Sequence, residues 1–144
     1  MDKEFEIIKK YFKPLAKNQE SLNLQNDAAF IKDKNLVVST DMMVEGIHFY
    51  KNDKPEEISR KLLRINLSDI AAMGAKPYGF FLNIALPKIK TSEWLKKFIS
   101  GLKSDMIKYN IKLFGGDLSK SSKVFLSVTI IGKTKSNCHE KNFA

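Results

Sequence analysis

YGFFLNIALPKIKTSEWLKKFISGLKSDMIKYNIKLF, residues 78–114, combines two hydrophobic periods, and their order decides the fold. Residues 78–87 are almost continuously apolar and close at Pro87, which predicts a buried strand. Residues 92–109 carry an apolar stripe at helical spacing, made of Leu95, Phe98, Leu102, Met106 and Tyr109. Residues 111–114 form a second, short apolar run. This order predicts two parallel strands joined by a helical, right-handed crossover.

The segments around this crossover add further strands and helices. The apolar runs AAFI (28–31) and LVVST (36–40) flank the polar turn KDKN, which predicts a β-hairpin. Residues 55–73 predict the longest helix, and residues 2–12 a shorter first one. Residues 123–132 are rich in β-branched side chains and predict a last strand. We expect an α+β fold, with a mixed sheet, helices on one face and the other face open.

Composition and charge limit the class of protein. The chain of 144 residues is long enough for one domain with a real core, so we take 1–144 as a single domain. No apolar run approaches the roughly 18–20 residues that cross a membrane, and the N-terminus lacks a signal peptide's apolar centre. One cysteine, Cys138, excludes an internal disulfide framework. These features indicate a cytoplasmic protein.

The net charge of +9 raises the question of a nucleic-acid partner. The lysines are scattered along the chain, and only two residues, Arg60 and Arg64, are arginines. Arginine is the side chain that most often reads base edges, and dispersed lysines are more typical of a solvated surface. The pattern therefore speaks against nucleic-acid binding.

Asp69 occupies a position where the pattern of the 55–73 helix requires an aliphatic residue. It continues the stripe of Ile58, Leu62 and Ile65 at helical spacing. A buried carboxylate without a partner costs several kcal/mol, so Asp69 must meet a cation or hydrogen-bond donors. Lys61 or a backbone amide is one solution, and a metal ion is the other.

Three further aspartates are expected at the ends of strands. Asp27 precedes AAFI, Asp41 follows LVVST, and Asp117 follows IKLFGG. Loops at strand ends commonly carry ligands, although aspartate also forms turns. Together with Asp69, and with the oxygens of Ser39 and Thr40, they indicate a site for a hard cation such as magnesium.

Other cofactor classes have weaker support in the sequence. The pair of glycines in GGD (115–117) allows a backbone to approach a phosphate closely, but neither a Walker A nor a GxGxxG pattern is present. Zinc is disfavoured because His48, His139 and Cys138 are scattered. From spacing alone, His48 can be a proton donor, a phosphate contact or a loop residue without a role, and Glu45 is equally open.

Longer motifs connect these residues to a known family. NDAAFI, STDMMVEGIHF, NLSDIAAMGAKP, WLKKFISGL and LFGGDLSKS follow one another in this order. The sequence resembles the N-terminal half of the thiamine-monophosphate kinase family, in the AIR synthase-related (PurM-like) superfamily. The resemblance implies transfer of the γ-phosphoryl group of ATP to thiamine monophosphate, giving thiamine diphosphate, with several magnesium ions. It also implies a homodimer in which the N-terminal sheets meet.

The resemblance assigns roles to single residues. The metal ligands it implies are Asp27, Ser39, Thr40, Asp41, Asp69 and Asp117. Gly116, Asp117 and Lys141 correspond to contacts with ATP, Lys141 at a position that is usually arginine. His48 corresponds to the contact with the thiamine phosphate. No side chain is assigned to covalent chemistry, because positioning and charge neutralisation dominate phosphoryl transfer.

Three departures from the family pattern accompany this resemblance. Gln25 and Asn26 replace a glycine and a carboxylate of the family motif. Ile99 stands where the family often has an aromatic residue near ATP. The chain also lacks the C-terminal domain that family members have. A non-catalytic remnant or dimerisation domain that retains the fold is therefore the alternative to a kinase.

Overall fold

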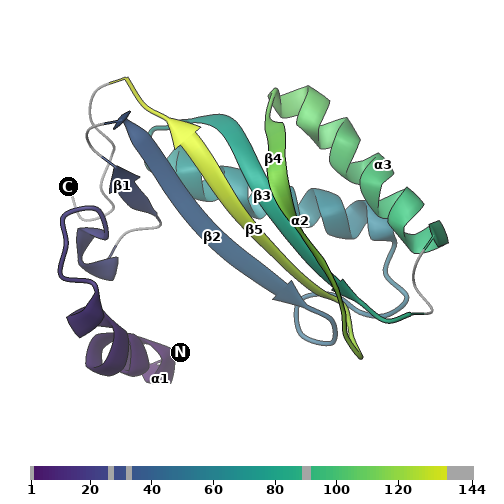
Figure 1. Cartoon of the computed structure of the whole chain (residues 1–144), viewed down its shortest axis with the longest axis horizontal. Coiled ribbons are helices and arrows are strands. Elements are labelled where there is room, and N and C mark those ends of the chain that lie inside the picture. Colours follow the sequence, from purple (N-terminus) through teal and green to yellow (C-terminus); the bar gives the residue numbers. More distant parts are fainter. Residues whose placement is uncertain (1, 26–27, 32–33, 89–91, 136–144) are drawn as a thin grey trace.

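Within the described residues of the computed structural model, five strands form one sheet, and two long helices cover one of its faces (Figure 1). The structure describes residues 2–25, 28–31, 34–88 and 92–135. The elements are α1 (Asp2–Ile7), a π-helical turn η1 (Ile8–Phe12), the 3-10 turns η2 (Lys13–Leu15) and η3 (Leu22–Leu24), β1 (Ala29–Ile31), β2 (Leu36–Val44), α2 (Pro55–Ala72), β3 (Lys76–Leu86), α3 (Ser92–Tyr109), β4 (Lys112–Lys120) and β5 (Phe125–Lys133).

The strand order β1-β2-β5-β3-β4 confirms the expected mixed sheet. β3 and β4 are parallel and are joined through α3, as the opening stretch of sequence predicts. β1 and β2 pair antiparallel, which confirms the hairpin. β5 lies between β2 and β3 and is antiparallel to both. β5 therefore joins the hairpin to the crossover unit.

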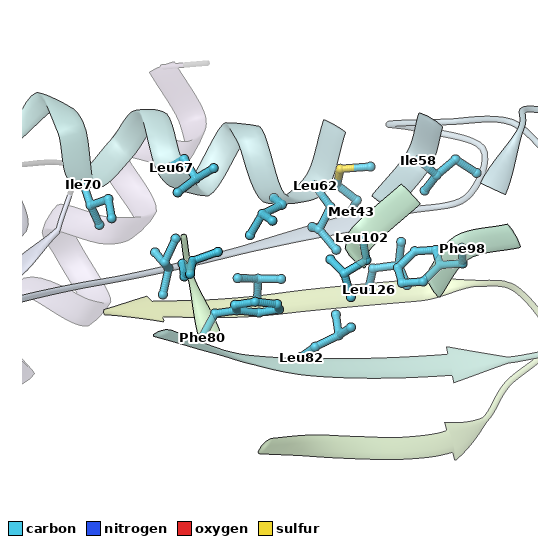
Figure 2. Packing of buried hydrophobic residues seen from close by; sticks show 14 of the residues in the cluster. Met43, Ile58, Leu62, Leu67, Ile70, Phe80, Leu82, Phe98, Leu102 and Leu126 are labelled. Atoms are coloured by element: carbon cyan, nitrogen blue, oxygen red, sulfur yellow. The ribbon is translucent and has the colours of Figure 1, made fainter. Parts of the chain in front are cut away.

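The core lies between the sheet and the two helices. Figure 2 shows side chains of α2 and α3, among them Leu62 and Phe98, pointing toward Phe80 and Leu126 of the sheet. These four side chains are almost completely buried. Burial alternates along β5, where every second residue from Leu126 to Gly132 is buried. This period of two is expected of a sheet with only one covered face.

Two strands extend beyond their predicted ends. β2 continues through Asp41 to Val44, and β4 continues through the two glycines of GGD and Asp117 to Lys120. The prediction that Asp41 and Asp117 sit in loops at strand ends was therefore wrong. The ladder between β3 and β4 shifts register between Phe80 and Phe81, a β-bulge that leaves Phe114 outside the pairing. Beyond the bulge the pairing resumes, because main-chain hydrogen bonds do not require side chains.

The N-terminal helix differs from its prediction in packing. The chain is helical from Asp2 but passes into a π-helical turn at Ile8. Phe5 and Phe12 of the predicted apolar stripe are exposed, and Ile8 is half-buried. Within the ranges that the structure describes, no helix has the length and apolar character needed to span a membrane.

The two long helices approach closely at Gly101 of α3. A Cβ at this position would collide with the Glu56 carbonyl and crowd the Ser59 hydroxyl of α2. Next to this contact, Arg64 donates two hydrogen bonds to the Asp105 carboxylate, at 2.9 and 3.1 Å. The Asp105 side chain is only 2% exposed, whereas that of Arg64 is half-exposed. The hydrogen bond that Arg64 donates to this carboxylate, and then the negative charge of the carboxylate, raise the pKa of Arg64 above its ordinary value.

We expect Arg64→Met to lower stability more than the double variant Arg64→Met/Asp105→Leu. The single change leaves a buried carboxylate without its cation, whereas the double change replaces the pair by apolar side chains. Urea denaturation followed by circular dichroism measures both midpoints, with Arg60→Met on the same helix as the control. A double variant less stable than Arg64→Met would show that the ion pair itself holds the helices together.

Candidate functional site

β2 divides its polar residues between the two faces of the sheet. Ser39 is buried and Asp41 half-buried, in phase with the buried residues Val37 and Met43 that face α2. Thr40 has the opposite phase and faces the open side. The Thr40 hydroxyl donates to the Val128 carbonyl oxygen at 3.1 Å and accepts from the Thr129 hydroxyl at 3.3 Å. Ser39 and Asp41 therefore face the helices, and Thr40 between them faces the open side of the sheet.

Asp69 belongs to the helix-covered side. It lies at the edge of the buried face of α2 and is half-buried, whereas Ile58 and Leu62 of the predicted stripe are buried. α2 packs against β2, which carries Asp41, and against β5, the neighbour of β2 in the sheet. Asp41 accepts a hydrogen bond from the Met42 amide at 2.9 Å through one carboxylate oxygen. Asp41 and Asp69 thus share one side of the sheet.

Asp117 lies on the other side. The register places Asp41 opposite Val128, and Asp117 opposite Asn83, which is itself opposite Ser127. Val128 is buried beneath the helices, whereas Asn83 and Asp117 are exposed. With three strand spacings between β2 and β4, Asp41 and Asp117 are also about 14 Å apart across the sheet.

The described acids consequently do not form one cluster. Among residues 2–25, 28–31, 34–88 and 92–135, no three histidine, cysteine, aspartate or glutamate side chains are placed to hold a metal ion together. The sequence had led us to expect convergence of Asp27, Asp41, Asp69 and Asp117. For Asp41 and Asp117, the alternation of side chains along β2 and β4 prevents it in a single chain. Asp27 and Lys141, like His139 and Cys138, lie outside the described residues.

Asp117 lines a shallow groove of about 170 Å³ on the open face. The groove runs across the sheet from β2 to β4, and its polar side chains other than Asp117 are Asn83, Ser119 and Ser127. Met42 and Phe125 supply apolar walls. Asn83 was missed by the sequence analysis, although an amide inside the apolar run of residues 78–87 was a signal. The groove offers a carboxylate, an amide and hydroxyls beside exposed apolar surface.

A second hollow, of about 420 Å³, lies beside β1 and β2. Four hydroxyl-bearing residues line it, Ser21, Ser39, Thr40 and Thr129. Hydroxyl and carboxylate oxygens are the donors that magnesium prefers, so the donors of Ser39, Thr40, Asp41 and Asp69 fit this ion by type.

Gly116 has a structural reason to be glycine. A Cβ at Gly116 would collide with the main-chain carbonyl of Leu82 on β3, its partner in the parallel ladder. At Gly115 a Cβ would meet only the Phe81 ring, at 3.4 Å. The first glycine of GGD is therefore replaceable by packing criteria, and the second is not. The predicted contact of Gly116 with ATP stays a prediction.

His48 lies in a tight turn at the end of β2. The amides of Ile47 and His48 both donate to the Val44 carbonyl, at 3.1 and 3.0 Å, and Gly46 donates to the Phe49 carbonyl at 2.7 Å. Gly46 has φ of +89°, a conformation that suits glycine. The His48 side chain is exposed to solvent. The turn therefore presents an imidazole on a well-bonded main chain.

Two charged residues accompany this turn. Lys61 of α2 donates from Nζ to the His48 carbonyl oxygen at 2.8 Å. Glu45 has one carboxylate oxygen, Oε1, that is buried without a hydrogen-bond partner within the described part of the chain. Lys61 was suggested above as a partner for Asp69. In the structure its ammonium donates a hydrogen bond to the main chain of the turn. Ile99, named above as a departure from the family pattern, is 54% exposed on α3.

Comparison with known proteins defines the class to which this fold and these residues belong. Residues 25–134 match the family described as AIR synthase related protein, N-terminal domain. The match covers most of the chain, so the chain belongs to this family.

Within the family, the similarity is to thiamine-monophosphate kinases. The enzyme of Buchnera aphidicola (subspecies Acyrthosiphon pisum) is 46% identical over 88% of this chain and 40% of its own length. That of Haemophilus influenzae is 35% identical over 96% of this chain and 44% of its own. The chain spans about two fifths of the length of these relatives.

Solved structures agree. The crystal structure of thiamine monophosphate kinase from Aquifex aeolicus covers 94% of this chain with a TM-score of 0.82 and 29% identity, and 44% of that chain is matched. AaThiL complexed with AMPPCP and TMP covers 98% of this chain with a TM-score of 0.89 and 29% identity, and 45% of that chain is matched. The expected resemblance in family and fold is thereby confirmed.

Proposed function

We propose that this chain is the N-terminal, ATP- and magnesium-binding domain of a thiamine-monophosphate kinase. The observation that carries the proposal is the likeness of 98% of the chain to AaThiL complexed with AMPPCP and TMP. AMPPCP is a non-hydrolysable analogue of ATP, and we take TMP to be thiamine monophosphate. The reaction breaks the bond between the β,γ-bridging oxygen and the γ-phosphorus of ATP and forms one from that phosphorus to a phosphate oxygen of thiamine monophosphate. ADP and thiamine diphosphate are the products.

The residues of the chain have positioning roles in this proposal. Asp27, Ser39, Thr40, Asp41, Asp69 and Asp117 would hold magnesium, which supplies charge neutralisation when it is bound. Gly116, Asp117 and Lys141 would bind ATP, and His48 the phosphate of the acceptor. Two polyanions repel each other, so holding them in line is the main task of the site.

The chain would act as a homodimer whose open sheet faces meet. Met42, Phe81 and Phe125 expose 40–60% of their surface on this face, which is what a covered interface requires. Because Asp117 faces the open side and Asp41 the helix side, contacts beyond a single copy of this chain would be needed to complete the site. The part of the relatives' length that these 144 residues do not match is one source of such contacts.

Calorimetry with ATP tests the proposal, with and without magnesium. We expect binding only with magnesium, and Asp41→Asn and Asp69→Asn each to weaken it by about tenfold or more, since each removes a charged ligand. Glu93→Gln, an exposed acid on α3, is the matched control and should bind as the parent does. Turnover is measured as thiamine diphosphate formed after adding the separately produced C-terminal part of the Buchnera relative.

The second candidate is a non-catalytic domain that keeps the fold and the dimer contact. The observation in its favour is that, among the described residues, no three histidine, cysteine, aspartate or glutamate side chains are placed to hold a metal ion together. It predicts a folded dimer that does not bind ATP with magnesium. That result, for a chain with a normal circular dichroism spectrum, would overturn the kinase proposal.

A further inference from the structure

The Val44 amide points away from β5 and donates its hydrogen bond to a side chain, not to a neighbouring strand. Within the described residues, β1 pairs with residues 36–38 of β2, so no described strand pairs with Val44 on that side. On its other side, the neighbouring Glu45 amide donates to the Val124 carbonyl at 3.0 Å. The Val44 amide donates to Nδ1 of His48 at 2.9 Å. The imidazole thus satisfies a main-chain donor that has no strand partner among the described residues.

This hydrogen bond determines which ring nitrogen carries the proton. A neutral imidazole has one N–H donor and one acceptor nitrogen. Because Nδ1 accepts from Val44, the proton of the neutral ring is on Nε2. His48 is an exposed residue, and Nε2 is the ring nitrogen that the bond to Val44 leaves for a ligand. The ring is then a donor, and its acceptor nitrogen is already occupied.

Lys61 stabilises the main chain that carries this ring. Its side chain belongs to α2, and its ammonium donates to the His48 carbonyl oxygen at 2.8 Å. The Val44 carbonyl meanwhile accepts from the amides of Ile47 and His48. Hydrogen bonds consequently fix the main chain of the turn at both Val44 and His48.

We propose that His48 is a fixed hydrogen-bond donor for an anionic oxygen, held as the Nε2–H tautomer by the Val44 amide, and that Lys61 is its positioning residue. The inference rests on the proposed function for the identity of the ligand, the phosphate of thiamine monophosphate. The phosphate of the acceptor has a second pKa of about 6 and is already ionised at neutral pH. It therefore needs a hydrogen-bond donor, and no base to remove a proton from it. Charge-assisted bonds to phosphate are the strong kind.

The tautomer is tested without any ligand, by NMR of the ¹⁵N-labelled chain at about pH 8, above the ordinary range of histidine titration. We expect Nε2 to carry the proton, and a scalar coupling across the hydrogen bond between the Val44 nitrogen and His48 Nδ1. His48→Gln identifies the signals among the two histidines. A proton on Nδ1, or a Val44 amide that exchanges as fast as an exposed one, would overturn the inference.

The role of Lys61 has its own readout. Lys61→Met should speed hydrogen exchange of the Val44 amide several-fold, whereas Lys97→Met, an exposed lysine of α3, should leave it unchanged. Equal exchange rates in Lys61→Met and the parent chain would remove Lys61 from the proposal.

The affinities of His48 variants for thiamine monophosphate show whether the ring acts as a hydrogen-bond donor at Nε2. Glutamine places an amide donor near the position of Nε2, whereas asparagine places its polar atoms near Nδ1. We expect His48→Gln to bind within a few-fold of the parent and His48→Asn about tenfold or more weaker, the loss typical of a hydrogen bond to a charged group. Equal losses in both would overturn the donor role. A parent chain that does not bind thiamine monophosphate even with the C-terminal part of the Buchnera relative added would overturn the proposed function, and the NMR results then decide the inference alone.

Discussion

Gly116→Ala is expected to disrupt the pairing of β3 with β4 and to cost about 3 kcal/mol or more of unfolding free energy, at or beyond the upper end for overpacking. The new Cβ would collide with the carbonyl group of Leu82, which is main chain and cannot rotate away. Leu82 is the register partner of Gly116, so relief requires the strands to separate. Urea denaturation followed by circular dichroism measures the loss.

Gly115→Ala is the matched control on the same strand. Its Cβ would contact only side-chain atoms of Phe81, at 3.4 and 3.5 Å, and a ring can adjust. We expect a change below about 1 kcal/mol. Equal effects at both glycines would contradict the packing argument. A Gly116→Ala chain that keeps its stability but no longer binds ATP would show that the glycine serves the nucleotide instead.

The parts of the fold that depend on local pattern were predictable. The crossover through α3 and the β1–β2 hairpin follow from apolar periods and turn residues close together in sequence. The place of β5 between β2 and β3 was not predictable, because it depends on pairing between strands distant in sequence. The length of β4 was missed because glycine and aspartate are weak strand formers, although edge pairing with β3 accommodates them.

The candidate site shows the same division. The types of residue in the motifs were sufficient to suggest magnesium and phosphate, but their placement depends on whether Asp41 and Asp117 lie in loops or in strands. Within a strand, a shift of one position moves a side chain to the opposite face. Asp41 therefore shares the helix side with Asp69, and Asp117 does not. The bond from the Val44 amide to His48 also has no signature in the sequence.

Phe80→Ala is expected to cost about 3–5 kcal/mol, the usual range for removing a fully buried phenylalanine. Phe80 is 0% exposed and lies beneath α2 and α3, where Figure 2 shows it among the core side chains. Small domains have about 5–15 kcal/mol of stability in total, so this loss is a large share of it. Urea denaturation at several protein concentrations measures the loss and should give the same value at each.

Phe81→Ala, one residue further along β3, distinguishes the two faces of the sheet. Phe81 is 40% exposed on the open face and makes an edge-to-face contact with Phe114, with ring centroids 5.9 Å apart. In a single copy of the chain its loss should cost only about 1 kcal/mol, the value of an aromatic pair. If open faces meet in the proposed homodimer, the cost must grow with protein concentration, because association stabilises only chains that retain the contact. A cost that is independent of concentration, in a parent chain that sediments as a monomer, would contradict the dimer and leave this apolar face to the rest of a longer kinase.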